Sequence, residues 1–177
     1  MLSRVLPVLL VLLPLSARAE RLDLLPPTTE VGIRFYGLGF VPLDGTFTRF
    51  RGWLEHDPNR QRNCVVRLTV DASSLTMANT AIRDEIVGPD YLDIANYPRL
   101  AYDGRCDGDD MTGQLEMHGV QRPFALTIER SPERYIATGR LRRADWGMAA
   151  NPTIGGQTVR IRVTIQRMPS STSPAVR

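Results

Sequence analysis

The stretch Val159-Arg160-Ile161-Arg162-Val163-Thr164-Ile165-Gln166 alternates one apolar with one polar residue over its whole length. Strict alternation has the period of a β-strand, because successive side chains of a strand point to opposite faces. One face of this strand would be apolar and the other charged, which is the pattern of an antiparallel sheet with one side in water. The stretch therefore predicts a sheet that covers an apolar interior.

Seven earlier stretches alternate in the same way, so the sequence predicts eight strands. These seven lie at about residues 31–35, 45–55, 66–70, 100–102, 115–117, 124–128 and 134–144. A turn with an Asp-Gly step, residues 107–110, separates the fourth strand from the fifth. A second turn is expected at residues 119–122, which would pair Met117 with Phe124 and Leu115 with Leu126.

Residues 73–98 break the alternation. Ile82, Ile86 and the pair Tyr91-Leu92 follow a helix-like spacing instead. A connection of this length without any structure of its own is unusual in a compact domain. We therefore expect one or two short helices between the third and fourth strands, forming a lid over one mouth of the sheet structure.

Both ends of the chain differ from this domain. Arg4, an apolar run over residues 5–15 and the small-residue pattern Ala17-Arg18-Ala19 are typical of a secretory signal peptide, predicted at 1–19. The run is shorter than the ~20 residues of a membrane-spanning helix, so no membrane segment is expected after cleavage. The sequence predicts a domain at 20–167, a disordered Ser- and Pro-rich tail at 168–177, and a periplasmic or secreted protein.

The charge of the chain argues against a nucleic-acid-binding role. All 22 of the Lys and Arg residues are arginine, yet the net charge of +3 falls to +1 when Arg4 and Arg18 are removed. The acidic residues are interspersed along the chain, whereas nucleic-acid-binding proteins need a basic surface. No nucleic-acid partner is therefore expected.

The two cysteines fall at the outer ends of the third and fourth strands. If Val70 lies opposite Leu100 in an antiparallel pair, the same register places Cys64 opposite Cys106. Directly opposed residues lie about 4.5 Å apart at Cα in a non-hydrogen-bonded pair, which a disulfide accepts. An exported protein also meets an oxidising compartment. We expect a structural Cys64–Cys106 disulfide; the alternative is a pair of buried free thiols.

A series of short motifs runs along the same region, and its order resembles the YceI-like family. The motifs are Gly45-Thr46-Phe47-Thr48-Arg49-Phe50-Arg51-Gly52, Asp71-Ala72-Ser73-Ser74-Leu75, Arg83-Asp84-Glu85, Tyr91-Leu92-Asp93, Tyr97-Pro98, His118-Gly119-Val120-Gln121-Arg122-Pro123 and Arg143-Ala144-Asp145-Trp146-Gly147. The resemblance implies an all-β fold, an eight-stranded antiparallel lipocalin-like barrel with a helical lid between strands three and four. It also implies binding of a polyisoprenoid or another long-chain lipid.

A barrel of eight strands is just wide enough to be filled by side chains or to hold a small ligand. The inward parity predicts the residues that would line a ligand cavity: Ile33, Phe35, Leu68, Val70, Leu100, Tyr102, Leu115, Met117, Phe124, Leu126, Leu141, Ile161 and Val163. Trp146 is a further candidate that would close one end of the barrel; the alternative is that it belongs to the ordinary core. Gly104, Gly113 and Gly139 share this parity and indicate either an open channel or bulges and corners of a filled core.

Two arginines are candidates for a lipid head group. Arg83 and Arg143 carry the planar fork that suits phosphate or carboxylate. The alternative is a structural role, in which Arg-Asp ion pairs or a helix cap hold the lid against the rim of the barrel.

The sequence gives no support for catalysis. His56 and His118 lie in no nucleophile motif or metal-ligand spacing, so we expect no catalytic residue, no metal and no cofactor besides a bound isoprenoid or fatty amphiphile. The prediction is an exported protein that holds a long-chain lipid for transport, storage or sensing, with homodimerisation left open. Its rivals are a filled barrel that acts through its surface as a stress-response or interaction module, and a lipid-modifying enzyme.

Overall fold

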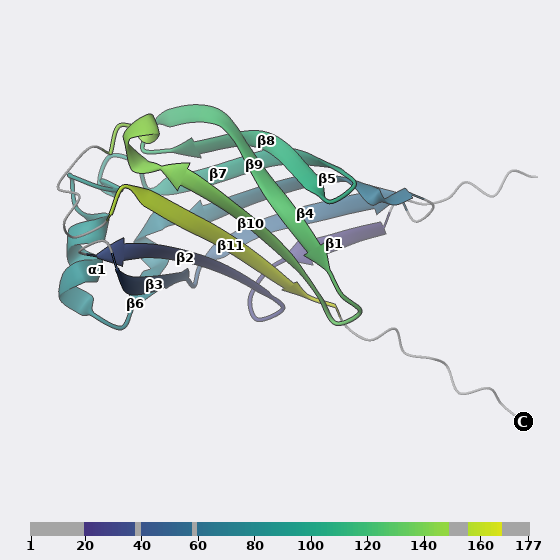
Figure 1. Ribbon diagram of the computed structural model, residues 1–177, viewed down its shortest axis with the longest axis horizontal. Helices are drawn as coiled ribbons and strands as arrows, with labels where there is room; N and C mark the ends of the chain where they lie inside the picture. Colours follow the sequence, from purple (N-terminus) through teal and green to yellow (C-terminus); the bar gives the residue numbers. More distant parts are fainter. Residues whose placement is uncertain (1–19, 38–39, 58–59, 149–155, 168–177) are drawn as a thin grey trace, which may run out of the picture.

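The computed structural model describes residues 20–37, 40–57, 60–148 and 156–167 (Figure 1). The predicted signal peptide, 1–19, and the predicted disordered tail, 168–177, lie outside the described residues.

The described residues form eleven strands, one α-helix and two short 3-10 helices. The strands are β1 (Glu20–Leu24), β2 (Thr29–Gly37), β3 (Val41–Phe47), β4 (Phe50–Asp57), β5 (Arg60–Asp71), β6 (Leu75–Met77), β7 (Arg99–Asp107), β8 (Asp110–Met117), β9 (Val120–Arg130), β10 (Arg134–Arg142) and β11 (Thr158–Gln166). The helices are η1 (Ala72–Ser74), α1 (Thr80–Val87) and η2 (Arg143–Trp146).

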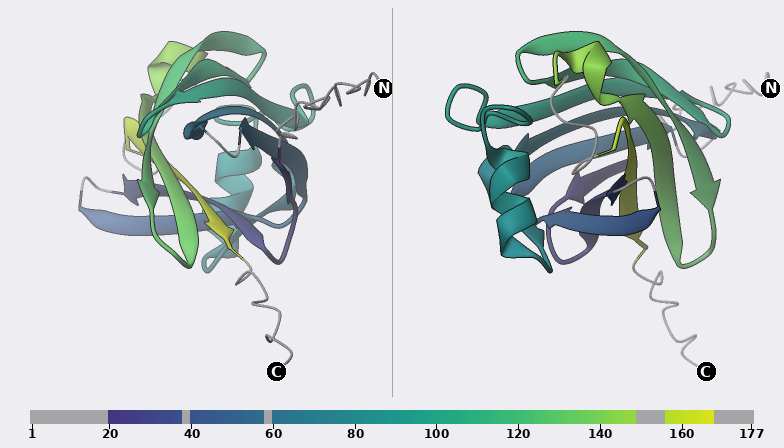
Figure 2. Two further views of the ribbon diagram at one scale, coloured as in Figure 1. Left: turned by 90° about the vertical axis from the view of Figure 1, so that its right-hand side faces the viewer. Right: turned by 60° about the vertical axis from the view of Figure 1, so that its left-hand side comes forward.

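All the described strands belong to one antiparallel sheet in the order β1-β4-β5-β7-β8-β9-β10-β11-β2-β3-β6. The sheet curls around an apolar interior, and α1 lies across one end of it (Figure 2). Within the described part of the chain, β1 and β6 are the edges and do not pair with each other. The all-β antiparallel class is therefore confirmed, but the sheet is a curled half-barrel with eleven strands, and the prediction of eight was wrong.

Three strands were not predicted: β1, β6 and the second part of the strand expected at 45–55. β1 pairs with β4 from Glu20↔His56 to Leu24↔Gly52, and β6 spans only three residues, too few to show an alternation. The single strand predicted at 45–55 is divided into β3 and β4 at Thr48 and Arg49. Ser74 stabilises this corner, since its carbonyl oxygen accepts from Thr48 N (3.2 Å) and its Oγ accepts from Arg49 N (3.0 Å).

The β5–β7 pairing confirms the predicted register and disulfide. Val70 lies opposite Leu100, and Cys64 lies opposite Cys106. The two cysteines form a disulfide with their Cα atoms 4.7 Å apart. No free cysteine remains among the described residues, which include both cysteines of the chain.

The β8–β9 hairpin corrects the second predicted turn. Met117 lies opposite Val120, so the turn consists of His118 and Gly119 rather than residues 119–122. Both turn residues have positive φ, 52° and 69°, as the tight two-residue hairpin turn of type I′ requires. Phe124 consequently faces Gly113, and Leu126 faces Met111. Met117 thus pairs with a residue four positions earlier in β9 than predicted. Because four is an even number, the same face of β9 remains apolar.

The connection between β5 and β7 contains the expected helix. Asn79 caps the start of α1, because its Oδ1 accepts from Ile82 N at 3.0 Å. We call residues 80–98 the lid. Ile86, Tyr91 and Leu92 of the lid are buried against the interior of the sheet.

Candidate ligand-binding cavity

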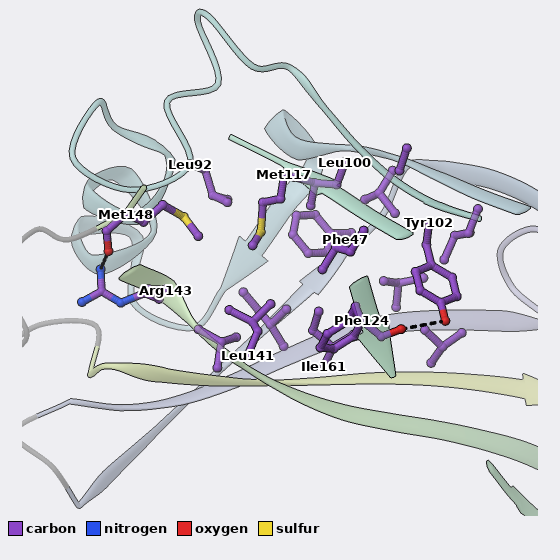
Figure 3. Close-up of a pocket in the computed structure, with 18 of the residues that line it drawn as sticks. Phe47, Leu92, Leu100, Tyr102, Met117, Phe124, Leu141, Arg143, Met148 and Ile161 are labelled. Carbon is purple, nitrogen blue, oxygen red and sulfur yellow. Dashed lines mark hydrogen bonds between the residues drawn. The ribbon is translucent and has the colours of Figure 1, made fainter. Parts of the chain in front are cut away.

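An apolar cavity of about 110 Å³ lies inside the curled sheet, beneath the lid (Figure 3). Among the described residues, the surface that the wall presents to the cavity is apolar. Strands from the whole width of the sheet contribute to it, together with the lid and the segment 143–148. The lining residues are Val31, Ile33, Phe35, Phe47, Leu68, Val70, Ile86, Tyr91, Leu92, Leu100, Ala101, Tyr102, Leu115, Met117, Phe124, Leu126, Leu141, Arg143, Met148, Val159, Ile161 and Val163.

Aromatic side chains fill the end of the interior away from the lid. Tyr102 and Phe124 meet edge to face, with ring centroids 6.3 Å apart, and the Tyr102 hydroxyl donates to the Phe124 carbonyl oxygen at 3.3 Å. Burial raises the pKa of Tyr102 to about 12, because the charged phenolate would be desolvated. Figure 3 shows this pair at the opposite end of the cavity from Arg143 and Met148. The cavity therefore has a closed apolar end and an end bounded by the lid, which we call the mouth.

The inward glycines belong to this closed end and do not widen a channel. A Cβ atom at Gly104 would lie 2.7 Å from the Tyr102 ring, and one at Gly139 would lie 2.6 Å from the Phe124 ring. Gly113, directly opposite Gly104, has still less room, since its Cβ would lie 2.3 Å from the Asp103 carbonyl oxygen. These positions therefore follow the alternative of a filled interior, because rings and neighbouring strands approach the glycine backbone closely.

The mouth is bounded by the lid and by the segment 143–148. Leu92 and Met148 are both buried and line the cavity there. Met148 N donates to the Arg143 carbonyl oxygen at 3.1 Å, which holds the segment as a tight turn after η2. Methionine is unbranched and adapts its shape easily, so Met117 and Met148 give the wall near the mouth an adjustable surface.

One charged residue, Arg143, is found among the described residues that line the cavity. Its side chain is buried, and its guanidinium lies over the Tyr91 ring. Nε donates to the Gly156 carbonyl oxygen at 2.6 Å, and Nη1 donates to the Met148 carbonyl oxygen at 3.4 Å. Desolvation lowers the pKa of Arg143, yet arginine remains a cation at neutral pH. A positive charge is therefore fixed at the mouth of an apolar cavity.

Arg83 is not among the cavity-lining residues. Its Nε donates to the Leu75 carbonyl oxygen (3.1 Å) and its Nη2 to the Ser73 carbonyl oxygen (3.0 Å). The third nitrogen pairs with the carboxylate of the neighbouring Asp84 at 2.9 Å. These bonds join α1 to η1 and β6. Arg83 thus has the structural role that was the alternative to binding a head group.

Trp146 packs behind the wall and does not line it. Its ring meets the edge of Phe124 at 6.2 Å, and its Nε1 donates to the Leu115 carbonyl oxygen at 3.3 Å. His118 anchors the same region, since its Nδ1 lies 3.1 Å from the Trp146 carbonyl oxygen and its ring contacts Tyr97 of the lid. The segment η2 is thus attached to the β8–β9 hairpin from outside the cavity.

The structure brings the other thirteen predicted lining residues together around the cavity; that they contact a ligand stays a prediction. Sequence reasoning missed several members of the wall. Val31, Phe47 and Val159 continue alternating stretches, and Ile86, Tyr91 and Leu92 lie on the expected lid, so these had a signal. Ala101 and Met148 had none, because Ala101 follows the outward parity and Met148 lies in an irregular segment.

The described residues include no group of three or more His, Cys, Asp or Glu side chains placed to hold a metal ion. Of the helices that the structure describes, none combines the length and hydropathy needed to cross a membrane.

Comparison with known proteins places this architecture in a family. The model of the YceI-like domain family matches residues 23–167. Protein YceI of Escherichia coli O6:H1 strain CFT073 is 31% identical over 101 residues, which cover 54% of this chain and 53% of that protein. The chain thus spans about half the length of the first curated relatives that it matches.

Two solved structures share the fold. BcnA of Burkholderia cenocepacia matches with a TM-score of 0.64 at 18% identity, over 79% of this chain and 96% of that one. A polyisoprenoid-binding domain from Saccharophagus degradans, described as implicated in plant cell wall breakdown, matches with a TM-score of 0.57 at 18% identity, over 83% and 98% of the two chains. At these identities the likeness shows the fold alone.

Proposed function

The chain belongs to the YceI-like domain family, and we propose that it is an exported binding protein that holds a long-chain isoprenoid or similar amphiphile inside the sheet. The observation that carries the proposal is a cavity with an apolar wall, closed at one end and bounded at the other by a buried arginine. The polyisoprenoid-binding domain of Saccharophagus degradans, which shares the fold, supports the ligand class.

The shape of the cavity suggests how such a ligand would lie. Its tail would extend toward the Tyr102–Phe124 pair, and each buried CH₂ group would contribute roughly 0.8 kcal/mol. The polar head would remain at the mouth beside Arg143, whose cation favours a carboxylate or phosphate. Because Arg83 lies away from the cavity wall, the head-group role is proposed for Arg143 alone.

The disulfide and the signal-like N-terminal sequence together support export to the periplasm or the exterior, where disulfides persist. Binding requires no bond to be made or broken, so we propose no catalytic residue.

Native mass spectrometry of the protein purified without detergent tests the proposal, combined with organic extraction of whatever accompanies it. We expect a defined adduct that extracts as a prenyl chain or fatty amphiphile. Leu115→Arg places a charge on the wall and should abolish the adduct. Gln114→Arg adds the same charge at the preceding residue of β8, on the exposed face, and should leave the adduct unchanged.

Because a buried charge can also unfold the protein, Ile161→Trp provides a second test, since it adds volume to the wall without charge. Circular dichroism and thermal unfolding establish that each variant is folded. If folded Leu115→Arg and Ile161→Trp both retain the adduct, the ligand is not in the cavity. A bare polypeptide that also binds no added prenol or fatty acid would favour the rival, a module that acts through its surface.

A further inference from the structure

Two neighbouring strands beside the mouth carry arginines and no acidic residue. β10 (RYIATGRLR) contains Arg140 and Arg142 near its end, and β11 (TVRIRVTIQ) contains Arg160 and Arg162 near its start. All four alternate with residues of the apolar wall such as Leu141 and Ile161, so they lie on the outer face of the sheet. Within the described parts of the chain, none of the four has an ion-pair partner.

Three arginines form a row across adjacent strands. Arg140 lies directly opposite Arg160, and Arg160 lies directly opposite Arg34 of β2. The row ends at Asp44 of β3, whose carboxylate accepts two hydrogen bonds from Arg34, at 2.6 and 3.0 Å. Like charges in directly opposed positions destabilise a sheet. The fold carries this cost on the outer face of β10, β11 and β2.

An apolar tip lies next to the row. The β2–β3 hairpin exposes Phe40 (74%), Val41 (40%) and Tyr36 (38%), three of the four large apolar residues exposed in the described chain. Aromatic and apolar side chains beside basic ones are typical of proteins that rest in the interface of a bilayer. A soluble polyanion would gain nothing from contact with Phe40 and Val41, so the apolar tip favours a membrane.

The row and the tip both adjoin the mouth. Arg142 directly precedes Arg143 of the cavity wall. Arg143 Nε donates to the Gly156 carbonyl oxygen, and a Cβ at Gly156 would lie 2.8 Å from the carbonyl oxygen of Tyr36. Figure 1 shows the ends of β2 and β10 and the start of β11 at the same end of the molecule as α1.

We propose that the outer face of β10, β11 and β2, with the tip formed by Tyr36, Phe40 and Val41, is a docking surface for an anionic phospholipid bilayer. In this position the arginines contact lipid phosphates, the tip enters the interface, and the mouth lies at the membrane surface. The inference goes beyond the proposed function, because docking requires only the outer face and does not depend on an occupied cavity.

Co-sedimentation with vesicles tests the surface. The full sequence is expressed, the soluble protein is purified, and vesicles of 30% phosphatidylglycerol in phosphatidylcholine are compared with pure phosphatidylcholine. We expect binding to the anionic vesicles that weakens as salt is raised. Each arginine near such a surface contributes roughly fivefold to partitioning, so Arg140→Gln with Arg160→Gln should weaken binding about 25-fold. Arg67→Gln with Arg105→Gln makes the same charge change on exposed positions of β5 and β7 and should weaken it less than about threefold.

A fluorescent label at the tip separates a bilayer from other polyanions. Both cysteines are in the disulfide, so Val41→Cys provides a single thiol for an environment-sensitive fluorophore. We expect a blue shift with anionic vesicles and quenching by brominated lipid chains. Equal losses in the two double variants would overturn the proposal, and so would a shift with polyglutamate but none with vesicles. Lipid retention by Arg140→Gln with Arg160→Gln should be normal, which separates failure of docking from failure of the proposed function.

Discussion

The guanidinium carbon of Arg143 lies 4.5 Å from the centre of the Tyr91 ring, which joins the segment η2 to the lid across the mouth of the cavity. A cation over an aromatic face is stabilised electrostatically, and more strongly where water is excluded. Tyr91 is 1% exposed and Arg143 is 4% exposed. The same contact thus closes the mouth and fixes a positive charge there.

Arg143→Met should therefore change the preference for the head group. We expect binding of a fatty acid to weaken by about tenfold or more, because a charge-assisted hydrogen bond contributes about 1.5–3 kcal/mol. Binding of the fatty alcohol with the same chain should change much less. Titration calorimetry measures both ligands, and Arg83→Met is the control with the same change of charge. Equal losses for acid and alcohol would show that Arg143 acts only by holding the mouth together.

Removal of the disulfide should destabilise the fold without changing its topology. The Cys64–Cys106 bridge closes a loop with a sequence separation of 42, for which the chain-entropy model gives roughly 4 kcal/mol. Cys64→Ser with Cys106→Ser should lower the urea midpoint accordingly. Dithiothreitol should shift the unaltered protein toward the same midpoint and leave the double variant unaffected. A midpoint unchanged by either treatment would contradict the prediction.

Gly113→Ala should be strongly destabilising, since its Cβ would lie 2.3 Å from a backbone oxygen and 2.6 Å from the Gly104 Cα atom. Overpacking of this kind typically costs about 1–3 kcal/mol. The matched control is Gly32→Ala, also in a strand, where the nearest atom would lie 3.6 Å away. Thermal unfolding should separate the two variants, and similar melting temperatures would contradict the close approach of β7 to Gly113.

The stability of the fold should fall at alkaline pH through Tyr102. Its pKa is raised from 10.0 to about 12 in the folded protein, so above pH 10 the unfolded chain releases this proton while the folded chain keeps it. Titration of Tyr102 leaves the free energy of unfolding unchanged below pH 10. Between pH 10 and 12 it lowers the free energy of unfolding by up to about 1.4 kcal/mol for each pH unit. Urea unfolding at pH 9 and 11 should show a smaller loss for Tyr102→Phe than for the unaltered protein.

Ser74→Ala should loosen the corner between β3 and β4. Ser74 Oγ accepts from Arg49 N at 3.0 Å and donates to the Asp71 carbonyl oxygen at 2.7 Å. Both partners would lose a hydrogen bond in a partly buried position, and about 1–3 kcal/mol for each unsatisfied group is therefore an upper bound. Ser73→Ala is the milder comparison, because Ser73 bonds the exposed side chains of Asp71 and Arg49. Hydrogen exchange at Arg49 N should increase in Ser74→Ala and not in Ser73→Ala.

The β5–β7 register could be predicted because two independent signals agree there. Apolar parity alone allows any register shift by an even number of residues. The cysteines select the one register that places them opposite each other. The β8–β9 hairpin has no such second signal. Its register is decided by His118 at a φ of 52°. Histidine adopts this conformation more often than most residues but still uncommonly, so the residue type alone does not indicate the turn. The predicted pairing therefore kept the correct face and had the wrong partners.

The features that the sequence did not predict depend on contacts between segments far apart in the chain. The break between β3 and β4 depends on Ser74, which lies 25 residues from Arg49 in the chain. Met148 reaches the cavity wall because η2 is attached to His118 and Leu115 from outside. Alternation identifies which face of a strand is apolar, and it carries no information about irregular segments that close the ends.

The disulfide also encloses the lid. Residues 65–105, which include α1 and Tyr97, lie between its two cysteines in the chain, so the bridge completes a covalent ring around them. A protease that cuts once within the lid would leave both fragments bonded to each other, and reduction would be needed to part them. Proteolytic opening of the mouth can thus proceed without loss of either half of the sheet.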